Sequence, residues 1–248
     1  MRRLGLVVGS YWPALAIAQR TPETVHDSEE NAVTGDSRAR ALDYGEFVAL
    51  ARHPGGTGMD GSEIYALPHQ IDHGHNVRQL RQAGCDRVLA IGSVGGLREE
   101  LAPGTFVCPD DFIALDAPAA TQLTGVGAHR VPGFDPDWRA TVVGAFAAAG
   151  TELVDGGVYW QANGPRLETP AEIRLIATHA DVIGMTIASE CVAAGELGVR
   201  YAAVCVVDNL ANGVGETQLT LEELEAGRAR NAATLDAALA AVLPALTG

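Results

Sequence analysis

The chain of 248 residues contains no lysine, so all 17 of its basic residues are arginines. A coding bias toward arginine is one explanation of this composition. Its chemical consequence is that a phosphate-binding loop built around a lysine is excluded. Any site for an anion must therefore use arginine, histidine, hydroxyl groups or backbone N–H groups.

The chain also has few cysteines and carries no excess of positive charge. The four cysteines are widely and irregularly spaced, mostly within apolar runs, and they are Cys85, Cys108, Cys191 and Cys205. This spacing is typical of reduced core thiols in a cytoplasmic protein and argues against a disulfide framework or a zinc site. The formal net charge of −14 makes nucleic acid and anionic membranes poor partners.

Long hydrophobic runs are missing as well. No stretch of about 18 uncharged apolar residues occurs, so we expect no membrane span. The first nine residues start like a signal peptide, but their apolar run is short and interrupted by glycine, which favours an immediate first strand. The apolar content of 47% is ample for a large core.

Strand and helix patterns alternate along the chain. Strands are expected at 4–8, 46–52, 87–91, 105–115, 152–160, 181–183 and 201–207, and helices at 70–83, 135–149, from 169, 187–197 and from 220. Residues 21–45, 54–61 and 116–134 are interpreted as a surface excursion, a mobile loop and a long loop. The pattern predicts a single α/β domain over residues 1–248, with a mostly parallel mixed central sheet flanked by helices.

Two polar segments follow predicted strands early in the chain. The run from Gly92 to Gly96 could cradle a phosphate with its N–H groups, or it could be a plain tight turn. It is not a G-x-G-x-x-G motif, and no acidic residue follows at the spacing that a dinucleotide site requires. Arg52 and His53 could bind an anion, with arginine as a bidentate fork, or could be an exposed pair.

The segment from Val158 to Val214 carries further candidate residues. Glu168 lies just before a helix with a capping box and has no evident structural task, although an exposed loop glutamate is common. Asp208 ends a buried strand, where it could turn the chain or serve as a desolvated acid. Met185 could be a core residue, and Thr186 the N-cap of the next helix.

A histidine cluster lies near the start of the helix expected at 70–83. His69 and His73 are four residues apart, and Asp72 and His75 are close by. There is no H-E-x-x-H motif and no clear remaining ligand set, so a solvated or substrate-facing cluster is favoured over a metal site.

Taken together, these segments resemble the trimeric purine nucleoside phosphorylase and 5′-methylthioadenosine phosphorylase family. Three blocks carry the resemblance in the right order: 84–104, then 164–172 with its Gly-Pro-Arg-Leu-Glu-Thr run, and 181–190. The resemblance covers most of the chain from Leu4 to the terminal helix. It implies a purine nucleoside phosphorylase, which splits the nucleoside into free base and sugar 1-phosphate.

The resemblance also implies roles for individual residues. The phosphate site implied is Ser10, Arg52, His53, Ser93 and Thr186; the ribose floor is Met185; the base contacts are Leu167, Glu168 and Asp208; and an apolar contact for the 5′ group is Leu221. Asp208 is implied to be the catalytic residue, a proton donor near N7 of the leaving purine. Inorganic phosphate is the implied co-substrate with no cofactor or metal, and a homotrimer is the implied assembly.

The nature of the base stays open at this stage. An ionised Glu168 only accepts hydrogen bonds, which suits N1–H of a 6-oxopurine. Asp208 instead suits the 6-amino group and N7 of adenine, although the second aspartate typical of methylthioadenosine enzymes is lacking after it. Because Leu221 is apolar, the sequence favours 5′-methylthioadenosine or a related 5′-deoxy or 5′-methylthio purine nucleoside, with inosine, guanosine and methylthioinosine as alternatives.

Other functions also stay open. A hydrolytic nucleosidase would use water in the same pocket. A dinucleotide-binding oxidoreductase would use the glycines at 92–96, and a purine-binding protein without activity would hold the nucleoside unchanged.

Overall fold

The computed structural model describes residues 3–26, 39–53, 55–57, 63–115, 121–215 and 219–248, with the backbone alone for 55–57, 63–65 and Leu221. Its strands are β1 (Leu4–Val8), β2 (Thr24–His26), β3 (Ala41–Asp43), β4 (Phe47–Ala51), β5 (Gly55–Thr57), β6 (Glu63–Tyr65), β7 (Arg87–Gly96), β8 (Phe106–Cys108), β9 (Asp111–Ile113), β10 (Val154–Asp155), β11 (Val158–Gln161), β12 (Val182–Gly184) and β13 (Arg200–Leu210). Its α-helices are α2 (His73–Gln82), α3 (Pro136–Ala148), α4 (Pro170–Ile176), α5 (Ile187–Glu196) and α6 (Leu221–Thr247).

Four parallel strands form the middle of the sheet, in the order β13, β7, β1 and β4. Their apolar runs are buried on both faces, as expected for central parallel strands. Antiparallel neighbours flank them, because β3 pairs with β4 and β8 pairs with β13. The predicted α/β fold with a mixed central sheet is therefore confirmed.

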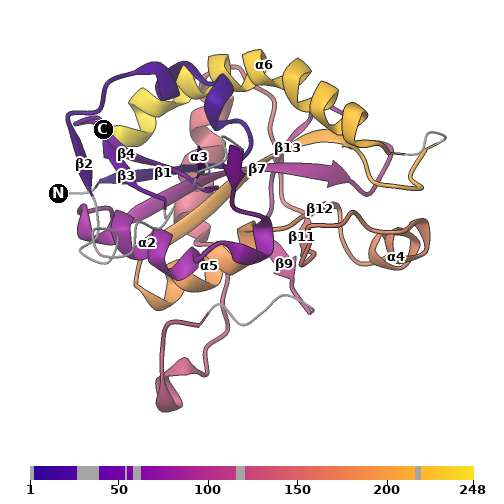
Figure 1. The fold of residues 1–248 in the computed structure, drawn as a ribbon, viewed down its shortest axis with the longest axis horizontal. Helices are drawn as coiled ribbons and strands as arrows, with labels where there is room; N and C mark the ends of the chain where they lie inside the picture. The colour runs from indigo at the N-terminus through magenta and orange to yellow at the C-terminus, as the bar shows by residue number, and fades with distance from the viewer. Residues whose placement is uncertain (1–2, 27–38, 54, 58–62, 116–120, 216–218) are drawn as a thin grey trace.

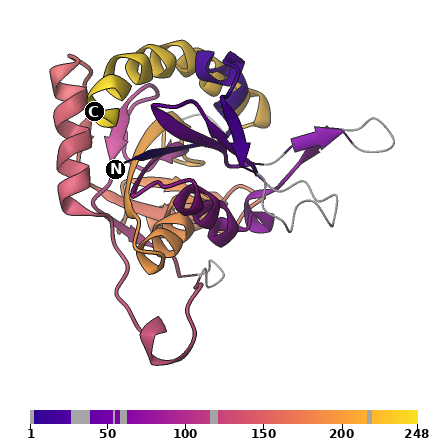
Figure 2. The same ribbon diagram turned by 90° about the vertical axis from the view of Figure 1, so that its left-hand side faces the viewer.

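Helices cover both faces of this sheet (Figures 1 and 2). Along β1, the side chains of Leu4, Leu6 and Val8 lie in one hydrophobic core and that of Val7 in the other, as the twofold periodicity of a strand requires. The first core is completed by α3 and α6, and the second by α2 and α5. A third, smaller core forms around α4. None of the described helices is long and apolar enough to cross a membrane.

The sequence placed most element centres correctly and several boundaries wrongly. The glycines at 92–96 were expected in a turn, but they continue β7, and β13 also runs past its expected end. Both strands extend because they pair with each other as far as their last residues, Gly96 and Leu210. The segment 152–160 forms two short strands, since Gly156 and Gly157 between them adopt positive φ.

The expected surface excursion and mobile loop are partly ordered as strands. In the first, β2 and β3 pair with each other at the edge of the sheet. In the second, β5 pairs with β6 in a separate two-stranded sheet. The remainder of the predicted mobile loop, at 54 and 58–61, lies outside the described residues.

Helix ends follow the capping signals of the sequence. Thr169 and Glu172 form a reciprocal capping box at the start of α4, and Thr220 and Glu223 form another at the start of α6. The α6 helix then packs closely on the end of β13. A Cβ added to Gly227 would lie 2.3 Å from the carbonyl oxygen of Asp208.

We predict that Gly227→Ala destabilises the protein. The added methyl group must push α6 away from β13, and overpacking of this kind costs about 1–3 kcal/mol. The matched control is Gly144→Ala on the exposed face of α3, where nothing lies within 4 Å of the new Cβ. That control should gain roughly 0.5–1 kcal/mol from helix propensity. Thermal or urea unfolding of both variants measures the difference, and equal stabilisation by the two would contradict the close packing of α6.

Candidate active site

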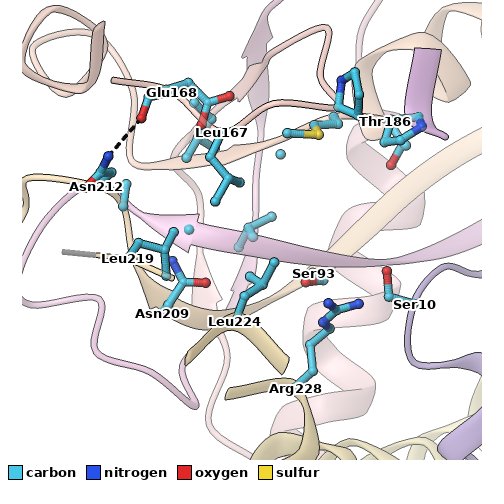
Figure 3. Close-up of a pocket in the computed structure, with 18 of the residues that line it drawn as sticks. Ser10, Ser93, Leu167, Glu168, Thr186, Asn209, Asn212, Leu219, Leu224 and Arg228 are labelled. Carbon is cyan, nitrogen blue, oxygen red and sulfur yellow. Dashed lines mark hydrogen bonds between the residues drawn. The ribbon is translucent and has the colours of Figure 1, made fainter. Parts of the chain in front are cut away.

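A pocket of about 250 Å³ opens where β1, β4, β7 and β13 end. This is the carboxyl edge of the parallel strands, where open α/β sheets bind ligands. Figure 3 shows that Glu168 and Asn212 lie toward one end of the pocket and Ser10 and Thr186 toward the other. The middle of the pocket is lined by apolar side chains.

The structure brings together all five residues predicted to bind phosphate. Ser10, Arg52, His53, Ser93 and Thr186 all line this pocket. Ser10 and Arg52 follow parallel neighbours, β1 and β4, and Ser93 lies within β7. The glycines around Ser93 do not form the tight turn that their composition suggested, because they belong to strand β7.

Arg52 is held in place by a buried ion pair with Glu190 of α5. Its Nε donates to Oε1 of Glu190 at 2.5 Å, its Nη2 donates to Oε2 at 3.1 Å, and its Nη1 donates to the carbonyl oxygen of Ile91 at 2.9 Å. Arg52 is 2% exposed and Glu190 1% exposed. Tyr201 of β13 donates to Oε2 of Glu190 at 2.7 Å, which adds a second support to the carboxylate.

Gly9 makes room for this guanidinium. A Cβ at position 9 would lie 2.6 Å from Nη1 of Arg52, so the backbone after β1 passes directly against the arginine. The glycine at position 9 thus has a packing reason.

His53 is neutral in this setting. Burial and the neighbouring charge of Arg52 lower the pKa of His53 to about 4, although the hydrogen bond to Ala66 opposes this. In the neutral ring, Nδ1–H donates to the carbonyl oxygen of Ala66 at 2.8 Å. The other ring nitrogen, Nε2, is then the hydrogen-bond acceptor.

The hydroxyl group of Thr186 does not cap helix α5. Thr186 is the N-cap of α5, as predicted, but its side chain makes no capping hydrogen bond. The hydroxyl oxygen of Tyr159 accepts instead from the backbone N–H groups of Thr186 at 3.2 Å and of Ile187 at 3.4 Å. The threonine side chain can therefore line the pocket while the helix start stays satisfied.

The opposite end of the pocket carries the predicted base and ribose residues. Leu167, Glu168 and Met185 all line it. The loop with Glu168 is tied to the end of β13 because Asn212 Nδ2 donates to the carbonyl oxygen of Glu168 at 3.2 Å. Met185 packs on the backbone of Gly164, where a Cβ would lie 2.5 Å from its sulfur.

Asp208 is the main correction to the predicted site. It does not line the pocket and its side chain is fully buried. Its carboxyl group accepts from Tyr11, from Ser93 at 2.5 Å and from Asn231 at 2.9 Å. Burial raises the pKa of Asp208, and these hydrogen bonds oppose the rise.

A register shift in β13 explains this placement. The pairing with β7 passes from Val207 to Asn209, so Asp208 falls at a bulge. The next residue, Asn209, lines the pocket in its stead. Among the described residues, Asn209 Oδ1 is buried without a hydrogen-bond partner, while its Nδ2 donates to the carbonyl oxygen of Leu210 at 2.8 Å.

Sequence reasoning also missed three lining residues near and on α6, namely Leu219, Leu224 and Arg228. Leu224 and Arg228 are four residues apart and thus share a helix face, which is the one signal that could have found the pair. The expected 5′ contact, Leu221, starts α6, and its side chain lies outside the described part of the chain.

The predicted histidine cluster is divided: His69, Asp72 and His73 line a second pocket, whereas His75 is buried beside Gln79. His75 bonds to Gln79 at 2.7 Å, and Nδ1 of His73 lies 3.7 Å from Oε1 of Glu190. His69 is exposed. Within the described ranges, no three His, Cys, Asp or Glu side chains are grouped as metal ligands would be.

Comparison with known proteins agrees with this geometry. The sequence model of the phosphorylase superfamily matches residues 3–244. The chain belongs to the phosphorylase superfamily.

Two relatives are similar in sequence to this chain over most of its length. It is 39% identical over 208 residues to a probable 6-oxopurine nucleoside phosphorylase of Archaeoglobus fulgidus, covering 82% of each chain. It is 33% identical over 206 residues to a probable S-methyl-5′-thioinosine phosphorylase of Xanthomonas campestris pv. campestris, covering 80% of each. The predicted family and the predicted enzyme class are thereby confirmed.

A solved structure supports the superfamily fold. Methylthioadenosine phosphorylase from Schistosoma mansoni, in complex with adenine, superposes with a TM-score of 0.79 at 20% identity, covering 99% of this chain and 92% of that one. At this identity the likeness concerns the fold alone.

For this phosphorylase, we predict that Glu190→Gln is strongly destabilising. Burial disfavours the charged form of Glu190, but the charge of Arg52 outweighs it and lowers its pKa to about 2. The variant leaves the Arg52 charge buried and unpaired, which costs about 3–5 kcal/mol near neutral pH. Since the pKa is lowered on folding, the wild-type advantage is complete above the unfolded pKa of about 4.3 and shrinks as the pH falls toward 2.

The control for this experiment is Glu172→Gln, which removes the charge from an ion pair with Arg166 on the surface. It should change the stability far less. Urea unfolding between pH 7 and pH 3 measures both variants. A Glu190→Gln deficit that stayed constant over this range would contradict the ion-pair origin of the effect.

Proposed function

We propose that this protein catalyses the phosphorolysis of a 6-oxopurine nucleoside. In this reaction a phosphate oxygen bonds to C1′, the C1′–N9 bond breaks, and the purine departs with the bonding electrons and takes up a proton. The pocket suits such a substrate because its two polar ends are separated by an apolar middle. Phosphate belongs at the end with Arg52 and Thr186, the sugar over Met185, and the base at Glu168 and Asn209.

The pairing of Glu168 with Asn209 is the observation that carries the choice of base. An ionised Glu168 accepts a hydrogen bond from N1–H of a 6-oxopurine, whereas N1 of adenine is itself an acceptor. The amide of Asn209 offers a second N–H for O6 and an oxygen that can accept N7–H of the protonated leaving base. The sequence-based argument for adenine depended on Asp208 as the base contact, whereas it is Asn209 that lines the pocket.

Asp208 is then a positioning residue. Its carboxyl group accepts from Ser93 of the phosphate end, and it immediately precedes Asn209 of the base end. We propose that it fixes these two neighbours relative to each other and does not itself contact the purine.

The sugar side supports the sequence-based expectation of an apolar 5′ group. Leu219 and Leu224 line the pocket near the start of α6. We therefore propose that 5′-methylthioinosine is accepted together with inosine and guanosine. The names of the relatives, which include probable thioinosine and 6-oxopurine phosphorylases, agree with this proposal.

We also propose that the protein is a homotrimer and that it is located in the cytoplasm. A homotrimer follows from the family resemblance, and the exposed apolar side chains of Val126 and Val131 on the projecting 121–134 segment support a contact between copies. The four buried free cysteines are consistent with the reducing cytoplasm.

A substrate panel tests the reaction and the base together. We expect phosphate-dependent release of hypoxanthine from methylthioinosine and inosine, with at least about 100-fold lower kcat/KM for methylthioadenosine and adenosine, because the mismatched N1 leaves Glu168 unpaired. High-performance liquid chromatography of the free base, with and without phosphate, measures this. Release that does not depend on phosphate would instead identify a hydrolase, and a preference for adenine would overturn the choice of base.

Two substitutions test the base contacts separately. Glu168→Gln should lower kcat/KM for inosine by about 100-fold while changing that for adenosine much less, because the amide can donate to N1 of adenine. Asn209→Ala should lower kcat for inosine by about 10²- to 10³-fold, the usual loss for one donor that stabilises developing charge. Steady-state kinetics measures both variants. Equal losses on both substrates for Glu168→Gln would show that Glu168 does not read N1.

A further inference from the structure

The predicted phosphate end of the pocket has little net positive charge of its own. Among the described lining residues, the basic side chains are Arg52, His53 and Arg228. Arg52 is neutralised by Glu190, with which it shares two hydrogen bonds. His53 is uncharged near neutral pH, because its pKa is lowered to about 4. The phosphate dianion therefore needs a further cation.

Arg228 is positioned to supply that charge. It projects from α6 one turn beyond Leu224, and in Figure 3 its guanidinium group points toward Ser10 and Ser93. Its Nε is buried without a hydrogen-bond partner among the residues that the structure describes. No carboxylate of the described residues lies within ion-pair distance of it, although its charge acts on nearby Asp208.

We propose that Arg228 is a phosphate-binding residue of this enzyme, in addition to the five residues predicted from the sequence. The inference deepens the proposed function, because it assigns a ligand contact for the phosphate co-substrate. Arg228 brings a guanidinium from the terminal helix to the Ser10 and Ser93 side of the anion, across from Thr186. In a chain without lysine, arginine is the remaining side chain that carries a permanent positive charge.

The surroundings of Arg228 favour phosphate over the nucleoside as its ligand. The base end of the pocket, at Glu168 and Asn209, lies away from the guanidinium group in Figure 3. The side chain that precedes Arg228 on the same helix face, Leu224, is apolar and suits the 5′ end of the sugar. The positive charge of Arg228 also lowers the pKa of Asp208, so it opposes the effect of burial on that carboxyl group.

The test compares Arg228→Gln, Arg228→Lys and the control Arg230→Gln, which lies on the exposed side of the same helix. Isothermal titration with inorganic phosphate alone measures phosphate affinity without any turnover. We expect Arg228→Gln to weaken phosphate binding by about 10- to 100-fold, as for the loss of a hydrogen bond to a charged group. Arg228→Lys should recover part of the affinity, and Arg230→Gln should match the wild type.

Kinetics at varied phosphate and varied nucleoside complete the test. Arg228→Gln should raise KM for phosphate with inosine and with 5′-deoxyinosine alike, and should leave KM for the nucleoside within about threefold at saturating phosphate. Phosphate affinity within twofold of the wild type would overturn the inference. A loss confined to inosine would also overturn it, because Arg228 would then contact the 5′ oxygen of the sugar.

The two proposals can fail separately. If the wild type releases no base from any nucleoside, the proposed function is wrong, whereas the phosphate titration still decides the role of Arg228. If Arg228→Gln does not fold, Arg228→Lys carries the decision, since loss of the bidentate fork should still weaken phosphate binding several-fold. In that case, if Arg228→Lys binds phosphate as tightly as the wild type does, Arg228 does not contact the phosphate directly.

Discussion

The buried pair of Arg52 and Glu190 is the interaction on which the rest of the site depends. It joins the end of β4 to the first turn of α5, and through Ile91 and Tyr201 it also contacts β7 and β13. Burying either charge alone would cost several kcal/mol, so the two side chains stabilise each other's position more than they stabilise the fold. These hydrogen bonds leave Arg52 one orientation, with its remaining N–H groups near Gly9 and the pocket. Because its charge is paired with Glu190, Arg52 brings no net positive charge to the predicted phosphate end of the pocket.

Other residues around the pocket supply the hydroxyl groups and the positive charge that the Arg52–Glu190 pair does not. Tyr159 caps α5 and thereby leaves the Thr186 hydroxyl to the pocket. Asp208 takes hydrogen bonds from Ser93 and Asn231 and thereby connects β7, β13 and α6 behind the pocket. Arg228, on the same helix as Asn231, lines the pocket and is the residue we propose to supply the missing positive charge. The contacts around the pocket thus come from strands of the central sheet and from the terminal helix.

The sequence was sufficient to predict the fold class and most of the pocket, for identifiable physical reasons. Continuous apolar runs revealed β1, β4 and β13, and the capping boxes marked the starts of α4 and α6. The residues at strand ends, such as Ser10 and Arg52, meet at one edge because parallel strands end together. Predictions from local patterns are correct at these positions because the local preference of the residues and their tertiary packing favour the same structure.

The errors arose where pairing between strands overrides local preference. The glycines after Ile91 have the composition of a turn, yet hydrogen bonding to β13 extends β7 through them. The bulge at Asp208 depends on that same pairing, and it decides whether an aspartate or an asparagine faces the pocket. A shift of one residue in a strand exchanges its two faces, so the chemistry of the base site could not be derived from the order of residues alone.

The glycines of β7 also explain why a strand, and not a loop, borders the pocket here. A Cβ at Gly95 would lie 3.2 Å from Ile183, and one at Gly96 would lie 2.7 Å from the carbonyl oxygen of Leu101. Without side chains at these positions, β12 can pair with the end of β7 and bring Met185 and Thr186 to the pocket. The same glycines that suggested a flexible phosphate loop therefore serve close packing. The predicted ribose and phosphate contacts, Met185 and Thr186, follow β12 and so depend on a β7 strand that leaves space beside it.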